Sequence, residues 1–409
     1  MPGKNPSSSP DNNDTTVTVS PKKSKTVTSS QVVTAPSVQA EEVPTIPMSS
    51  LQTLNALQPE VSVASAQAVR RPAPLVVQPS EYRRSIGESL QIWWDGIRPA
   101  YLPLSIMPVL LGTTLAWTQS ITTKTPFGHL RITHFVATLL AVVLLQIGAQ
   151  LINDYYDYVR GIDTSNTFGP GGLIQQGFVQ PTRVLLLGIV ALCAGMLIGA
   201  IVAVAGGLYV LLFGVIGVLC AYLYSASARS LSSIALGEVV SFLIFGPLIT
   251  LGTYLVQMNQ ISTPSRSQLI SVLLYSIALG LFATAIIHVN NMRDAESDEQ
   301  ANKHTLATIL GMRLSRALFF LLVLGAYIIV IALGIPRNTP HLTLITLWTL
   351  PLLLVTLTGM LRADLPASLH LVMRQALKLE TYFTLLLIVA LLISAFFVAL
   401  PGISSHIPL

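Results

Sequence analysis

The stretch FVATLLAVVLLQIGAQLINDYYD (135–157) joins a long apolar run to two carboxylates. Its apolar part approaches the ~20 residues that an α-helix needs to cross the ~30 Å hydrocarbon core of a bilayer. An ionised side chain is costly in such a setting, so Asp154 and Asp157 are candidates for a functional site. The stretch therefore predicts a membrane-spanning helix whose end carries chemistry.

The rest of the chain also has the composition of an integral membrane protein. Of its 409 residues, 52% are hydrophobic and 10% are charged, against about 25% charged in ordinary soluble domains. From Pro99 onward, nine apolar segments approach or exceed the spanning length. They cover 101–118, 132–156, 183–205, 207–225, 234–257, 268–291, 313–334, 342–361 and 376–399. This pattern predicts an all-α fold, a polytopic membrane bundle of about nine transmembrane helices.

The first part of the chain is a different kind of segment. Residues 1–85 are rich in Ser, Thr and Pro and show no sustained amphipathic period. Such a composition buries too little apolar area to offset the entropy of the chain. We expect a disordered tail over 1–85 and a transmembrane domain over 86–400.

Lysine and arginine are distributed unevenly between the two sides of the expected bundle. With the N-terminus in the cytoplasm, thirteen of them fall on the cytoplasmic side and four on the other, leaving out the tail. The four are Lys124, Arg131, Arg266 and Arg337. This asymmetry follows the positive-inside rule. It predicts a multi-pass protein of the cell membrane, and basic loops explain the net charge of +5 without a nucleic-acid partner.

Acidic residues are scarce within the expected bundle and gather at two helix ends. Between Gly96 and Ala363 there are eight. They are Asp154, Asp157 and Asp163 after the second segment, Asp294, Glu296, Asp298 and Glu299 after the sixth, and Glu238 early in the fifth. Under this topology all eight fall on the cytoplasmic side. Solubilising a loop does not require such clusters, so they indicate a site.

The two clusters match each other in spacing. INDYYD (152–157) aligns with VNNMRD (289–294), and both share the pattern N-[DN]-x-x-D at a helix end. Residues three and four apart lie on one face of a helix, so Asn153 and Asp157 face the same way. We interpret the match as a pseudo-repeat within the bundle.

Oxygen ligands at opposed helix ends suit a hard cation. Mg²⁺ prefers such ligands and commonly bridges carboxylates to substrate phosphates. Cationic side chains that could neutralise phosphate oxygens lie nearby, namely Arg160, Arg293 and Lys303. Two alternatives stay open: acids and bases that merely pair in solvated loops, and an ion site without phosphate.

Other side chains near the clusters suit a carbocation reaction. An allylic diphosphate ionises when a metal and cations stabilise its leaving group, and a membrane cavity shields the carbocation from water. Aromatic faces can stabilise that cation, and the candidates are Tyr155, Tyr156, Tyr222 and Tyr224. An interfacial aromatic belt explains each tyrosine equally well. Glu238 and His288 are further pocket candidates, with a helix-terminal charge and a core histidine as their alternatives.

Longer stretches around the clusters resemble a known family. NDYYDYVRGID (153–163) and NNMRDAESDEQANKHTLATILG (290–311) are similar to the two aspartate-rich motifs of the UbiA superfamily of intramembrane prenyltransferases. The spacing to Asp163 resembles the 1,4-dihydroxy-2-naphthoate prenyltransferase branch. Three further stretches share this likeness: IRPAYLPLSIMPVLLGT (97–113), GPGGLIQQGFV (169–179) and QALKLETYFTLLLIVALLI (375–393).

The resemblance implies a UbiA-like bundle of nine helices with a central cavity that opens to lipid. Both motifs would hold Mg²⁺ against the diphosphate of a polyprenyl donor. The implied ligands are Asn153, Asp154, Asp157 and Asp163 in the first motif, and Asn291, Asp294 and Asp298 in the second. Lys303 matches a lysine in the family's GK-T-L stretch, where Asn302 replaces the usual glycine.

The resemblance also implies an aromatic acceptor. That acceptor would be 1,4-dihydroxy-2-naphthoate, with loss of carbon dioxide, and the catalytic set would be Asp154, Asp157, Asp294 and Asp298. Acceptors of other branches stay open: 4-hydroxybenzoate, homogentisate, chlorophyllide, haem and glycerol phosphate.

A transporter is the main rival class. Transporters also use intramembrane charges, but their sites lie near the midplane at broken helices, whereas these acids lie at helix ends on one side. A structural scaffold would give no reason for the acid clusters. We therefore expect a Mg²⁺-dependent prenyltransferase whose active site faces the cytoplasm.

Overall fold

The computed structural model describes residues 85–121, 128–161, 173–226, 230–258, 263–336 and 340–399. Apart from Ser85, the expected tail lies outside these residues, and so does Asp163. Helices make up the regular structure of the described residues, and no named strand is found among them. The prediction of an all-α fold is confirmed.

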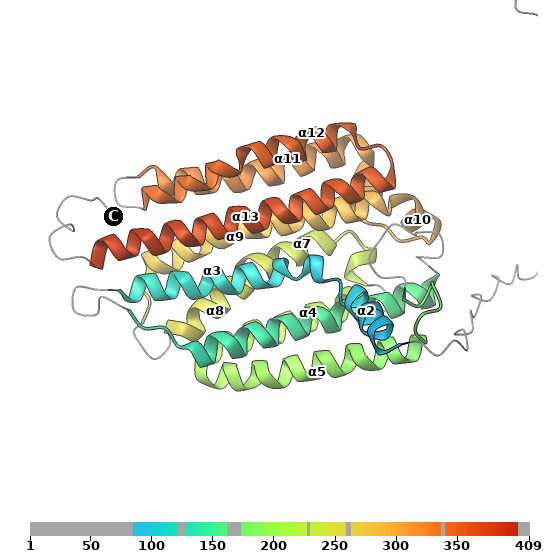
Figure 1. Ribbon diagram of the computed structural model, residues 1–409, viewed down its shortest axis with the longest axis horizontal. Helices are drawn as coiled ribbons and strands as arrows, with labels where there is room; N and C mark the ends of the chain where they lie inside the picture. The colour runs from blue at the N-terminus through green and yellow to red at the C-terminus, as the bar shows by residue number, and fades with distance from the viewer. Residues whose placement is uncertain are drawn as a thin grey trace, which may run out of the picture. The chain divides into compact units, whose positions relative to one another are not determined.

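Long helices lie side by side and form a bundle (Figure 1). In chain order the elements are α2 (Ile86–Ile97), η3 (Pro99–Tyr101), α3 (Pro103–Ser120), α4 (Ile132–Arg160), α5 (Pro181–Gly206), α6 (Leu208–Ser225), η4 (Leu231–Ser233), α7 (Gly237–Leu243), η5 (Ile244–Leu248), α8 (Ile249–Met258), α9 (Arg266–Arg293), α10 (Ala295–Gln300), α11 (Leu306–Gly334), η6 (His341–Thr349), α12 (Leu350–Arg362) and α13 (Pro366–Ala399).

Each of the nine predicted segments coincides with a helical segment of the structure. Within the described residues, seven helices are long and apolar enough to cross a membrane. Two further helices, Ile86–Tyr101 and Pro103–Ser120, are long and apolar enough only when taken together. They are bent by 53° relative to each other, so they form a candidate for one broken span. Leu208–Tyr224 in α6 is apolar but shorter. The chain is therefore a multi-pass membrane protein, as its composition predicts.

Helices α4 and α5 approach each other closely at small residues. A Cβ added to Gly148 of α4 would lie 2.7 Å from the backbone nitrogen of Leu192, and one added to Gly195 of α5 would lie 2.9 Å from the carbonyl oxygen of Ala141. Small residues allow such contact between membrane helices, where lipid removes the hydrophobic drive for association. This contact fixes α4, which carries the first acidic motif.

Helix α9 is the best buried of the seven spans. Of its most apolar stretch 61% is buried, against 17% for α5, and α9 packs against α7, α11 and α13. It begins at a capping box in which Ser265 accepts from the backbone of Gln268, and Asp294 follows its last residue as the C-cap. The central helix of the bundle therefore carries the second acidic motif at its end.

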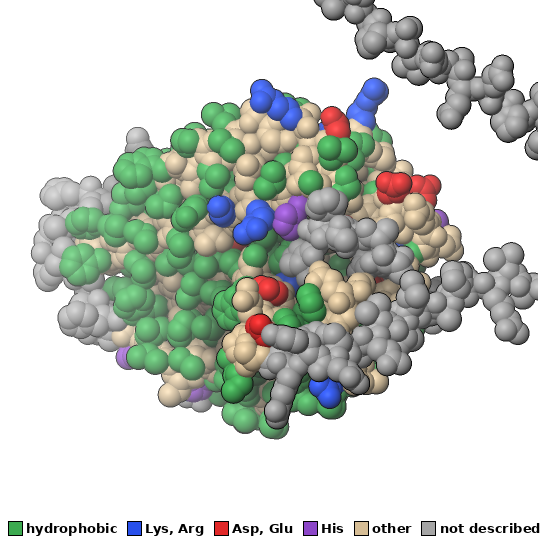
Figure 2. All heavy atoms as spheres, turned by 45° about the vertical axis from the view of Figure 1, so that its right-hand side comes forward, with side chains coloured by type: hydrophobic (Ala, Val, Ile, Leu, Met, Phe, Trp, Pro, Cys, Tyr) green, Lys and Arg blue, Asp and Glu red, His purple; other side chains and the backbone are tan. Residues whose placement is uncertain are grey.

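Both motifs lie at the same end of the bundle. Helix α4 ends at Arg160, and the next residue, Gly161, adopts the left-handed conformation (φ 68°) that glycine tolerates. At the same end of the bundle, α9 leads into α10 (Figure 1). With that end turned forward, Figure 2 shows acidic and basic side chains gathered on it, while hydrophobic side chains cover the flank. This division matches a bundle with lipid around its flank and a polar site at one end.

Candidate active site

The first motif lies in the last two turns of α4. Asp154 and Asp157 are 4% and 6% exposed. Asp154 forms an ion pair with Arg98, which separates α2 from η3. The amide of Asn153 donates to Asp157 Oδ2 at 2.7 Å, as expected for residues four apart on one helix face. The helix therefore presents one carboxylate paired with a cation and one oriented by an amide.

The second motif spans the end of α9 and the short helix α10. Asn290 donates its amide to Asp294 Oδ2 at 3.3 Å, and the Arg293 guanidinium donates to the same carboxylate at 2.7 Å. Asp298 in α10 is 1% exposed and lies 3.1 Å from the Lys303 ammonium. The partly buried Asp294 and the buried Asp298 thus each have a cation beside them.

The pseudo-repeat is visible in these hydrogen bonds. Asn153 bonds to Asp157 as Asn290 bonds to Asp294. Asn290 was not among the predicted ligands, although the alignment of INDYYD with VNNMRD could have identified it. The predicted ligand Asn291 instead donates to Glu238 Oε1 at 2.9 Å.

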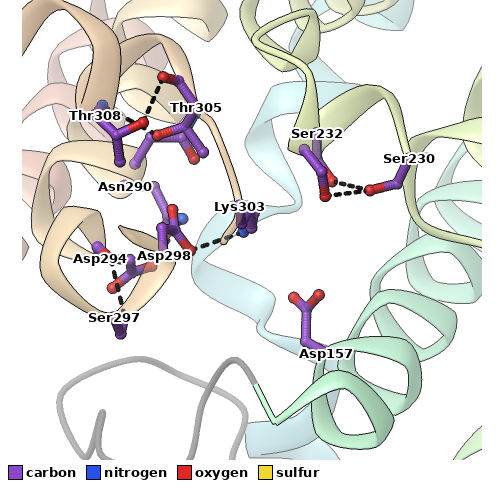
Figure 3. A network of polar contacts seen from close by, with 12 residues as sticks. Asp157, Ser230, Ser232, Asn290, Asp294, Ser297, Asp298, Lys303, Thr305 and Thr308 are labelled. Atoms are coloured by element: carbon purple, nitrogen blue, oxygen red, sulfur yellow. Dashed lines mark hydrogen bonds and ion pairs between the residues drawn. The ribbon is translucent and has the colours of Figure 1, made fainter. Parts of the chain in front are cut away.

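The two motifs face each other across a gap. Figure 3 shows Asp157 on one side and the Asp298–Lys303 pair on the other, with Ser230 and Ser232 above. Burial raises the pKa of Asp298 to about 7, although the Lys303 ammonium opposes this shift. Burial would lower the pKa of Lys303, but Asp157 and Asp298 raise it above its usual value. The lysine therefore stays cationic between carboxylates of both motifs.

The loop after α10 has a conformation that directs Lys303 inward. Asn302 adopts a left-handed φ of 56°, which Asn and Gly tolerate better than other residues. This explains how asparagine stands where the resembling family has glycine. The Lys303 backbone N–H donates to the Asp298 carbonyl at 2.8 Å, and the next residue, His304, exchanges backbone hydrogen bonds with Ser233 and Ala235.

Other predicted cations occupy different positions. Arg160 lies with its guanidinium carbon 5.4 Å from the ring centroid of Tyr156, one turn earlier in α4. Arg293 is held at Asp294 and Asn290. The sequence-based prediction did not include Arg98, although it lies in the stretch IRPAYLP and pairs with Asp154.

A cavity of about 300 Å³, here named the inner cavity, extends into the bundle from the acidic end. Its walls are largely apolar, with Val142, Phe213 and Phe245 among them. Asn153 and Tyr224 line it at the end where the motifs lie. An elongated apolar group with a polar head matches this division of the lining.

The residues predicted to line the pocket lie in different surroundings. Tyr224 lines the inner cavity. Tyr155 and Tyr156 meet edge to face at 5.4 Å between ring centroids, and Tyr222 is half exposed. Glu238 and His288 form a buried contact of 3.0 Å. This contact joins α7 to α9, so the two residues hold the second motif's helix in position.

The described residues contain no cluster of three or more His, Cys, Asp or Glu side chains that could hold a metal ion. The predicted ligand Asp163 lies outside the described residues. Most of the motif carboxylates are instead balanced by Arg98, Arg293 and Lys303.

The described part of the chain is thus a multi-pass helical bundle with two facing acidic motifs beside an apolar cavity. The chain belongs to the UbiA prenyltransferase family, which matches residues 105–379. It is a prenyltransferase, as are the curated relatives to which it is similar.

Two curated relatives and one solved structure illustrate these likenesses. The 1,4-dihydroxy-2-naphthoate octaprenyltransferase of Bacillus subtilis is 28% identical over 78% of this chain and 97% of the relative. The UbiA prenyltransferase domain-containing protein 1 of Danio rerio is 30% identical over 71% of this chain and 81% of the relative. A UbiA homolog from Archaeoglobus fulgidus bound to GPP and Mg²⁺ aligns with a TM-score of 0.49 and 16% identity, covering 72% of this chain and 99% of that one.

Proposed function

We propose that this chain transfers a polyprenyl group from an allylic diphosphate to 1,4-dihydroxy-2-naphthoate, with release of carbon dioxide, to give a demethylmenaquinone in its reduced, hydroquinone form. The observation that carries the proposal is Asp157 facing the Asp298–Lys303 pair, beside the end of the inner cavity that Asn153 and Tyr224 line. The diphosphate suits the polar end and the polyprenyl chain suits the apolar walls. The acceptor is supported by the branch-like stretches of the sequence and by the name of the Bacillus subtilis relative. The catalytic domain in this proposal is 86–400.

The donor set fits Mg²⁺. Asp298 Oδ2 is buried and accepts no hydrogen bond from the described part of the chain, and Asp157 opposes it from α4. Carboxylate oxygens are the ligands that Mg²⁺ prefers. We propose that Asp157 and Asp298 hold it and that Asp154 and Asp294 join them on release from their arginines. When bound, Mg²⁺ would neutralise diphosphate oxygens and stabilise the diphosphate as a leaving group.

The chain's own side chains contribute charge, orientation and exclusion of water. Lys303 and Arg293 supply positive charge beside the acidic residues, where diphosphate oxygens would gather. Asn153 fixes one oxygen of Asp157. The apolar walls of the inner cavity keep water from an allylic cation, and the Tyr224 ring in its lining can stabilise that cation.

The bond changes balance without a base at the attacked carbon. The allylic C–O bond breaks, and its electron pair leaves with the diphosphate. The ring carbon that bears the carboxylate then forms a C–C bond to the prenyl carbon. Loss of carbon dioxide returns the electron pair of the broken C–C bond to the ring and restores aromaticity.

The choice of acceptor tests this proposal. Membranes containing the chain would receive a radiolabelled polyprenyl diphosphate with either 1,4-dihydroxy-2-naphthoate or 4-hydroxybenzoate. We expect labelled lipid product with the naphthoate and at least tenfold less with the benzoate. Efficient prenylation of 4-hydroxybenzoate with no product from the naphthoate would assign another acceptor branch.

We further propose that the chain lies in the cell membrane with both motifs in the cytoplasm. The support is the thirteen-to-four division of Lys and Arg. In a background with Cys193 and Cys220 changed to alanine, Glu299→Cys at the motif end and His129→Cys at the other end are the test positions. A membrane-impermeant thiol reagent added to intact cells is expected to label only His129→Cys. Labelling of Glu299→Cys in intact cells would contradict the orientation.

A further inference from the structure

A second cavity of about 420 Å³, here named the outer cavity, lies at the acidic end of the bundle. Residues of α2, η3, the 173–178 turn and the first half of α13 line it. Leu173, Phe178 and Leu377 give it apolar surface. The proposed diphosphate site and the inner cavity do not account for this space.

Charged side chains lie among the apolar lining of the outer cavity. Two guanidinium groups, those of Arg98 and Arg374, and the imidazole of His370 line it, with Asp95 as the acidic member. Arg98 is committed to Asp154, which leaves the exposed Arg374 guanidinium as the cation that can pair with a ligand. A single guanidinium beside apolar surface suits an amphipathic monoanion better than a diphosphate.

The two cavities share a wall that touches both acidic motifs. Arg98 and Tyr101 line the inner and the outer cavity alike. Arg98 pairs with Asp154 of the first motif, and the Tyr101 hydroxyl lies 3.4 Å from Asn290 Oδ1 of the second. The outer cavity therefore adjoins the inner cavity at the end where the reacting carbon of a prenyl donor would lie.

We propose that the outer cavity binds the acceptor as an aromatic carboxylate, with Arg374 pairing to the carboxylate group and the aromatic ring lying against Phe178 and Leu377. This inference rests on the proposed function and assigns the two substrates to adjoining cavities, with the ring meeting the prenyl carbon where the cavities share Arg98 and Tyr101. A guanidinium pairs with a carboxylate through two parallel hydrogen bonds, and a two-ring acid is small enough for the volume. The bond changes are those given above.

Arg374→Gln is the test variant. With purified chain in nanodiscs, we expect this change to raise the KM for 1,4-dihydroxy-2-naphthoate at least tenfold, because the paired charge is lost. The KM for the polyprenyl diphosphate should stay within twofold. Arg374→Lys should recover part of the affinity, since it keeps charge but not the planar fork. Arg362→Gln, at an exposed cation that ends α12, is the control and should match the unmodified chain.

A competitive inhibitor separates a carboxylate contact from general damage. For 1,4-dihydroxynaphthalene, which has no carboxylate, the constant for competitive inhibition against the naphthoate should be the same with and without Arg374→Gln. An equal rise in this inhibition constant and in the KM for the naphthoate would overturn the inference, as would an unchanged KM for the naphthoate. An effect seen only in nanodiscs that contain phosphatidylglycerol would assign the outer cavity to lipid phosphate and overturn it too.

Failure of the inference and failure of the proposed function give different results. If the unmodified chain prenylates the naphthoate and Arg374→Gln leaves its KM unchanged, the inference fails and the proposed function stands. If the chain uses 4-hydroxybenzoate instead and Arg374→Gln raises the KM for that acid, the proposed acceptor fails and the outer cavity keeps its assignment to an aromatic carboxylate.

Discussion

Asp157→Asn and Asp298→Asn are each expected to lower kcat by about 10²- to 10³-fold, the size of effect seen when one electrostatic stabiliser of a transition state is removed. Both carboxylates are buried and face each other across the gap between the motifs. Asparagine keeps the size of the side chain but removes the charge that would hold a cation against the diphosphate. The measurement is the initial rate of purified chain at saturating donor and acceptor.

Matched controls lie on the same short helix. Glu296 and Glu299 flank Asp298 in α10 and are exposed, so Glu296→Gln and Glu299→Gln should keep kcat within about twofold. Equal membrane insertion and equal melting temperature of all four variants would exclude a folding defect. Near-normal turnover by Asp157→Asn would show that the Asp157 carboxylate is not needed for the reaction and would contradict its proposed role.

Chelation of divalent cations is expected to abolish turnover, and added Mg²⁺ to restore it. Without a divalent cation the diphosphate would compete with the motif carboxylates for Arg98, Arg293 and Lys303, and like charges at close range repel strongly. Turnover in excess EDTA should fall to about 1% or less, since metal binding is worth several kcal/mol of transition-state stabilisation.

A binding measurement complements the chelation experiment. Polyprenyl diphosphate should bind at least tenfold more tightly with Mg²⁺ than with EDTA, and Asp157→Asn should lose most of that difference. Turnover in EDTA above half of the Mg²⁺ rate would contradict a metal-dependent site.

The fold could be predicted from the sequence because the bilayer sets a simple length rule. Nine apolar segments correspond to helical segments of the structure, since every backbone polar group in lipid must bond within its own helix. The rule gives no information on helix shape. It did not predict the 53° bend before α3 or the π-helical turn η5 around Pro247 in the fifth span, because both depend on how neighbouring helices pack.

The site was predictable where it depends on local spacing. The bond between Asn153 and Asp157 follows from four-residue separation on a helix. Arg98 pairs with Asp154 across 56 positions of the chain, and Glu238 meets His288 across 50. Such pairs are set by the tertiary arrangement of the helices, so helical periodicity cannot reveal them.

The ratio of the three products tests the proposed reaction, prenyl transfer with loss of carbon dioxide, most directly. Purified chain would be incubated with Mg²⁺, a polyprenyl diphosphate and 1,4-dihydroxy-2-naphthoate labelled in its carboxyl carbon, and diphosphate, labelled carbon dioxide and prenylated product would be counted together. We expect the three to appear in a 1:1:1 ratio. Diphosphate release without prenylated product, or a prenylated product that keeps the labelled carboxylate, would contradict the proposed reaction.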